Sequence, residues 1–247
     1  MTAIAAFAPL HAEIAKLRRS LSGLMVLAAP VVLAVFTFAN MVRLDEPRSW
    51  DSWLQGTTAI WAQFMLPMSM TAITVLAAQA EHGPRSWDYL RALPLPRWRL
   101  YASKAVMVMG LGAAMTALVA LAVPGAAMLA GLAKPAIAAS GGGDIAAYAA
   151  SLGKMLAAST LLVAIQLWVA LRFASFAPAL ATGIAGTFFA LTAWNAQNGI
   201  YFPWLMPINT LADEPGRAGL ALALGGAGGV AVFAAMTAHL SVREHQG

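Results

Sequence analysis

Six long apolar runs divide the sequence, and short polar segments separate them. Most of these runs are long enough to cross the roughly 30 Å hydrocarbon layer of a membrane as a single helix. The pattern therefore predicts an all-α polytopic membrane protein with six transmembrane helices. We expect these helices over residues 21–39, 57–80, 102–133, 155–171, 175–194 and 218–240.

The third run is longer than one crossing needs and contains Pro124 followed by Gly125. Proline removes a backbone donor and clashes with the preceding helical turn. We therefore expect a kink or a break there, with the last part of the run forming a short re-entrant piece on the outer side. The polar segments 42–55 and 135–153 read as outer loops, the second being rich in alanine and glycine.

Residues 1–20 carry apolar side chains at roughly helical spacing, and their charges follow an apolar stretch instead of preceding it. This order differs from that of a cleavable signal, so we expect the segment to be retained. The spacing favours an amphipathic helix lying in the membrane interface, with a frayed lead-in as the alternative. The apolar positions are Ile4, Phe7, Leu10, Ile14 and Leu17.

Composition supports one membrane domain over residues 1–247. Hydrophobic residues make up 60% of the chain and charged residues 10%, where a soluble domain has roughly 25% charged residues. The absence of cysteine excludes disulfides and thiolate chemistry. The net charge of +5 suits lipid headgroups better than nucleic acid, because the basic residues lie in short segments without interleaved aromatic residues.

The basic residues are distributed unevenly between the two sides. Ten of them fall on the side that holds both termini, the second-to-third connection and the fourth-to-fifth turn, against five on the other side. The richer side is expected to be cytoplasmic. It carries Lys16, Arg18, Arg19, Arg85, Arg91, Arg97, Arg99, Lys104, Arg172 and Arg243; the other side carries Arg43, Arg48, Lys134, Lys154 and Arg217.

The connection between the second and third runs, residues 81–99, is not composed like a flexible linker. Trp87 and Leu90 lie at helical spacing with Asp88 and Arg91 beside them, which predicts a short amphipathic helix along the membrane face. The prolines at positions 94 and 96 end this helix and start the next one. Arg97, Arg99 and Lys104 are then expected at the headgroups.

Glu81 opens this connection at the membrane boundary. It has three possible roles, namely capping a helix, pairing with Arg85 or Lys104, and coupling to protons. Its position at the end of a span, away from the middle of the bilayer, favours pairing or capping.

The chain resembles the ABC-2 family of export permeases, and within it the branch of lantibiotic-immunity-type permeases. The second span ends in a similar pattern of Glu, Trp, Leu and Pro, followed by a basic residue and a lysine at the start of the third span. The residues that fit are Glu81, Trp87, Leu90, Pro94 or Pro96, Arg97 and Lys104. Residues 171–180 and 201–207 are also similar to that branch.

The resemblance implies that residues 81–99 couple the chain to a cytoplasmic ABC ATPase dimer, which holds the ATP and Mg. A second permease chain, identical or paralogous, and a bacterial cytoplasmic membrane are implied as well. The coupling residues would be Glu81, Arg85, Trp87, Asp88, Leu90, Arg91 and Arg97. An ordinary positive-inside loop without a partner is the alternative.

No phosphate-binding loop is expected on this chain, because Gly153-Lys154 is followed by Met155 and not by Ser or Thr. We therefore expect no enzyme activity and no cofactor on the chain itself. The cargo that the resemblance favours is amphipathic or hydrophobic, such as a peptide antibiotic or a lipid-like molecule. A membrane anchor or sensor that only recruits an ATPase is the alternative function.

Aromatic residues and prolines gather in the last outer segment, before the sixth run. We interpret them as an outer gate or interface, with simple anchoring in the membrane interface as the alternative. The residues are Tyr201, Pro203, Trp204 and Pro207. Small residues at 110–112, 183–186 and 225–229 allow close helix contacts, either within one chain or between two.

Overall fold

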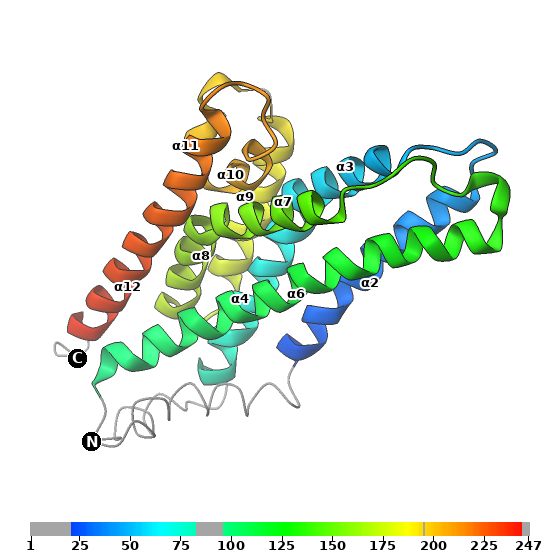
Figure 1. Ribbon diagram of the computed structural model, residues 1–247. Helices are drawn as coiled ribbons and strands as arrows, with labels where there is room; N and C mark the ends of the chain where they lie inside the picture. Colours follow the sequence, from blue (N-terminus) through cyan, green and yellow to red (C-terminus); the bar gives the residue numbers. More distant parts are fainter. Residues whose placement is uncertain (1–20, 83–95, 195, 244–247) are drawn as a thin grey trace, which may run out of the picture.

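The computed structural model describes residues 21–82, 96–194 and 196–243, and within these ranges the regular structure is helical (Figure 1). An isolated bridge joins the loop that contains Ser49 to the loop that contains Ser140. The longer helices are α2 (Leu21–Val42), α3 (Trp50–Ile60), α4 (Leu66–His82), α6 (Arg97–Ala133), α7 (Ile145–Ala158), α8 (Thr160–Arg172), α9 (Ala177–Thr192), α11 (Arg217–Ala223) and α12 (Gly229–Arg243). Short elements are η1 (Trp61–Met65), η2 (Pro135–Ile137), η3 (Gln197–Tyr201), η4 (Pro203–Leu205), α10 (Met206–Asn209) and η5 (Leu224–Gly228).

The count of membrane crossings differs from the six expected. Among the described residues, four helical stretches are long and apolar enough to cross a membrane, or five if the bent pair α7 and α8 counts as one. The stretch expected as the fifth crossing, α9, has 16 residues. At 1.5 Å per residue it measures about 24 Å, which is shorter than the hydrocarbon layer. Six crossings are therefore not confirmed.

Two outer segments expected as loops are partly helical. Helix α3 begins at Trp50, where the Ser49 hydroxyl accepts a hydrogen bond from the Ser52 amide. Helix α7 begins at Ile145, where the Asp144 carboxylate accepts one from the Ala147 amide at 2.8 Å. Local capping by serine and aspartate explains both starts, and hydropathy alone did not reveal them.

The expected break at Pro124 is absent, since α6 runs without interruption over 37 residues. Proline removes a single backbone donor, and membrane helices often accommodate that loss when neighbouring helices pack around them. Helix α2 likewise continues through Pro30 and packs along α6. Together α2 and α6 form one long slanted side of the molecule (Figure 1).

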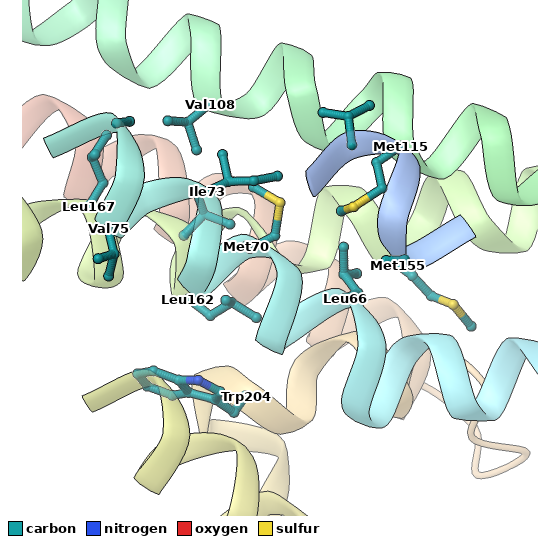
Figure 2. Packing of buried hydrophobic residues seen from close by; sticks show 14 of the residues in the cluster. Leu66, Met70, Ile73, Val75, Val108, Met115, Met155, Leu162, Leu167 and Trp204 are labelled. Carbon is teal, nitrogen blue, oxygen red and sulfur yellow. The ribbon is translucent and has the colours of Figure 1, made fainter. Parts of the chain in front are cut away.

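The core is built around α4. Its buried residues Leu66, Met70 and Ile73 belong to the same core cluster as Val108 of α6 and Leu162 of α8, and Figure 2 shows Leu66 on the side of Met115 and Met155. The outward face of α2 is also apolar although it is exposed, as expected for a surface in contact with lipid. Its exposed residues include Leu24, Val31, Val35 and Phe36.

The helices define two ends, which we call proximal and distal. At the proximal end α2 begins, α4 ends, α6 begins and α12 ends, and in Figure 1 these points lie at the lower side. The turn between α8 and α9 lies there too, because Gln79 on α4 donates to the Ala174 carbonyl at 3.2 Å. This common end is the side that the charge distribution predicts to be cytoplasmic.

Candidate functional site

A buried ion pair joins α4 to α6 at the proximal end. The Lys104 ammonium donates to a carboxylate oxygen of Glu81 at 2.9 Å, and the side chains are 1% and 0% exposed, respectively. The sequence placed Lys104 at the headgroups, and the structure shows that its side chain is buried between helices; pairing with Lys104 was one of the roles considered for Glu81. Both partners flank the connection between the two helices, so the pair fixes the spacing of its two attachment points.

Two further contacts tie neighbouring helices together near the same end. Gln79, two residues before Glu81, binds the Ala174 carbonyl in the turn between α8 and α9. On α8 the Trp168 indole donates to Nδ1 of His239 on α12 at 3.2 Å, and the two rings lie 5.3 Å apart. Hydrogen bonds and an ion pair therefore connect α6, α4, the α8–α9 turn and α12 in series.

Most of the predicted coupling residues cannot be placed. Arg85, Trp87, Asp88, Leu90 and Arg91 lie outside the described residues, as do residues 1–20 of the expected interfacial helix. Arg97 is the first residue of α6, and Pro96 precedes it as the N-cap. Of the coupling set, the described residues are thus Glu81 and Arg97, on either side of the connection.

The four outer residues do not form one surface. Tyr201 is 64% exposed, whereas Trp204 is 5% exposed and packs against Gly186 of α9. The Phe202 ring stacks on Trp204 and meets Phe189 edge to face. Pro207 is buried in α10, and Pro203 begins η4. Trp204 therefore packs inside the protein and does not serve as an anchor in the membrane interface.

Two adjoining cavities open at the distal end, the larger between α3, α7 and the loop before α11, and the smaller between α3, η1, α10 and the same loop. They hold about 510 and 420 Å³ and share Ala59, Leu211 and Asp213 in their linings. The larger cavity has carboxylates from three elements on its wall as well as apolar side chains. Its acidic residues are Asp51, Asp144 and Asp213.

Sequence reasoning missed Gln79, Trp168 and His239 as partners, because their contacts join positions that lie 71 or 95 residues apart. No local pattern marks such pairs. Within the part of the chain that the structure describes, no group of three or more metal-ligating side chains comes together.

These helices, with their apolar outer faces and long apolar stretches, define a multi-pass membrane protein. The family model for the ABC-2 family transporter protein matches residues 10–192. The chain therefore belongs to the ABC-2 transporter family, whose members are membrane components of ABC transporters that lack the ATPase site. Searches of curated proteins and of solved structures found no match to the chain.

Proposed function

We propose that the chain is the transmembrane permease subunit of an ATP-driven ABC-2 exporter. The family match over residues 10–192 is the observation that carries this proposal. ATP and Mg belong to a separate cytoplasmic ABC ATPase dimer, and the chain itself performs no chemical reaction. The resemblance to lantibiotic-immunity-type permeases is a finer part of the same proposal.

Residues 81–99 serve as the coupling element in this proposal. A partner that pulls on the connection moves the end of α4 and the start of α6 together, because the Glu81–Lys104 pair holds them. A buried ion pair resists separation strongly, since either charge left alone in a low-dielectric interior is costly. Trp87 and Leu90 supply the apolar contacts to the ATPase, with Arg85, Asp88, Arg91 and Arg97 at its rim.

We place the chain in the bacterial cytoplasmic membrane, with both termini in the cytoplasm. A second permease chain, identical or paralogous, completes the transporter, and lipids contact the exposed apolar face of α2. Tyr201, Pro203, Trp204 and Pro207 shape the outer part of the path.

The cargo proposed is amphipathic or hydrophobic, such as a peptide antibiotic or a lipid-like molecule. Two features support this class. Among the described residues, the charged side chains buried in the fold are Glu81 and Lys104, and these neutralise each other. The distal cavity combines apolar residues with carboxylates, which suits a molecule with one apolar and one cationic part better than a small ion.

Co-purification tests the proposal directly. The affinity-tagged chain is expressed with its genomic neighbours and purified into lipid nanodiscs, and mass spectrometry identifies bound proteins. We expect an ABC ATPase with nucleotide hydrolysis activity. The double variant Trp87→Ala, Leu90→Ala is expected to release the ATPase or to uncouple its hydrolysis from transport.

The matched control is the double variant Tyr201→Ala, Leu220→Ala, which removes one aromatic and one leucine side chain exposed near the opposite end. It should retain the ATPase at the wild-type level. Purification of the chain alone at full expression would contradict the permease proposal. Retention of an ATPase without cargo transport would instead favour a membrane anchor or sensor.

A further inference from the structure

Four helices have one end at the proximal end, and each of them stops or changes geometry after a similar length. From that end, α4 runs 17 residues to η1, α8 runs 13 to Ser159, α9 runs 16 to Thr192, and α12 runs 15 to η5. At 1.5 Å per residue these lengths are roughly 20 to 26 Å. We call this level, defined by η1, Ser159, Thr192 and η5, the break layer.

The discontinuities are of different kinds, so they do not arise from one repeated sequence motif. Both η1 and η5 are π-helical turns inside longer helices. Helices α7 and α8 meet at Ser159 with a bend of 41°. Such π-helical turns are uncommon and are frequently found at functional sites.

Packing follows the same division. On the distal side α3 and α11 pack against α7, and α10 packs against both α7 and α11. On the proximal side α4, α9 and α12 each pack against α8. Helices α2 and α6 cross the layer without a break. The molecule thus contains a proximal half-bundle of α4, α8, α9 and α12, and a distal half-bundle of α3, α7, α10 and α11.

Backbone contacts mark the crossing of two breaks. A Cβ added to Gly225 would collide with the Ala158 backbone, and one added to Gly229 would lie 2.5 Å from the Leu161 amide nitrogen. Gly228, in the same run, has nothing within 4 Å of such a Cβ. The glycine run therefore makes its close contact within this chain, directly on the bend between α7 and α8.

Polar groups at the bend are satisfied locally. The Ser159 amide bonds to the Met155 carbonyl at 2.9 Å, and the Ser159 and Thr160 hydroxyls donate to the Leu156 and Ala157 carbonyls. In a membrane, an unpaired backbone group at such a break costs several kcal/mol. The bend is thus stable without help from water, and a backbone-on-backbone contact permits rotation without unlocking interdigitated side chains.

We propose that the break layer is a hinge about which the distal half-bundle turns relative to the proximal half-bundle. The pivot is the close contact of Gly225 and Gly229 with the backbone of residues 158–161. The contacts Gln79–Ala174 and Trp168–His239 tie α4, the α8–α9 turn, α8 and α12 of the proximal half-bundle together, and the Glu81–Lys104 pair joins α4 to the start of α6. This inference deepens the proposed transport function, because a turn at the break layer would move the distal half-bundle, which lines the larger distal cavity, relative to the proximal end where the ATPase is proposed to bind.

Distances between pairs of spin labels test the hinge, and the absence of native cysteine makes labelling specific. Proximal labels are placed at Arg172→Cys and Val242→Cys, and distal labels at Lys154→Cys and Leu220→Cys. All four positions are exposed. The full-length chain is measured in nanodiscs, diluted with unlabelled chain so that distances within one chain dominate.

We expect narrow distance distributions for the pairs within each half-bundle, and broader ones for the cross pairs Lys154–Val242 and Arg172–Leu220. Cross pairs as narrow as the within-half pairs would overturn the hinge. This result needs no ATPase, so it is independent of the co-purification test. A hinge pattern without any bound ATPase would contradict the transport proposal alone.

The pivot is tested in the same labelled chains. The substitutions Gly225→Ala and Gly229→Ala should shift the mean distance of the cross pairs and leave the within-half pairs unchanged. Gly228→Ala is the matched control, because it brings the same change in helix propensity into open space. An equal shift for Gly228→Ala would overturn the assignment of the pivot. If a pivot variant fails to fold, the cross-pair widths of the unsubstituted chain still decide whether the hinge exists.

Discussion

Lys104 and Glu81 are charged side chains that lie inside an otherwise apolar bundle, so their energetics depend on both being present. We expect Lys104→Met to lower the free energy of unfolding by about 3–5 kcal/mol, because it removes the ammonium group that is ion-paired with the buried Glu81 carboxylate. Equilibrium unfolding in mixed micelles measures the change. The double variant Glu81→Gln, Lys104→Met should recover most of the loss, and a double variant as unstable as the single one would contradict this account.

Glycines in similar small-residue patterns have different surroundings. A Cβ on Gly183 would collide with the Thr71 side chain of α4, whereas one on Gly110 would meet nothing within 4 Å. We therefore expect Gly183→Ala to destabilise the fold by about 1–3 kcal/mol through overpacking. Gly110→Ala should be neutral or slightly stabilising in the same unfolding measurement, and equal losses at both positions would argue against the close contact of α9 with α4.

At the scale of elements, the extensive contact between α8 and α12 includes one hydrogen bond and one ring contact between Trp168 and His239. Trp168→Phe keeps an aromatic ring but removes the indole donor to His239. We expect a loss of about 1 kcal/mol in the free energy of unfolding, the usual net value of a neutral hydrogen bond. Trp98→Phe is the control, since Trp98 is 53% exposed, and it should change stability little.

Hydropathy predicted the helical class and the approximate place of every long apolar helix, because burial in lipid requires long apolar runs. It could not predict α7, where Asp144 caps an alanine-rich segment that reads as a loop. The expected end of α9, Trp194, lies two residues beyond the observed end at Thr192. For the candidate site, the sequence indicated Glu81 and its possible roles. That Lys104 is its ion-pair partner depends on how α4 and α6 pack, which the sequence does not show.

On the scale of the whole molecule, the described charges alone do not fix the orientation. The bias that predicts it comes largely from the basic residues at 16–19, 85 and 91, which lie outside the described ranges. The structure adds an independent observation on the topology, because it brings the ends of α4 and α12, the start of α6 and the α8–α9 turn to one end of the molecule. Orientation and the crossing by α9 can therefore be tested with the same set of variants.

Single-cysteine variants in the cysteine-free chain decide both questions. Arg43→Cys, Phe173→Cys and Tyr201→Cys place a thiol at exposed positions after α2, after α8 and after α9. In intact cells treated with a membrane-impermeant maleimide, we expect labelling at positions 43 and 201, and labelling at 173 only after permeabilisation. Labelling at 173 alone in intact cells would reverse the orientation. Labelling at 43 alone would mean that α9, at 16 residues, returns to the side from which it started, and that the chain crosses the membrane fewer than six times.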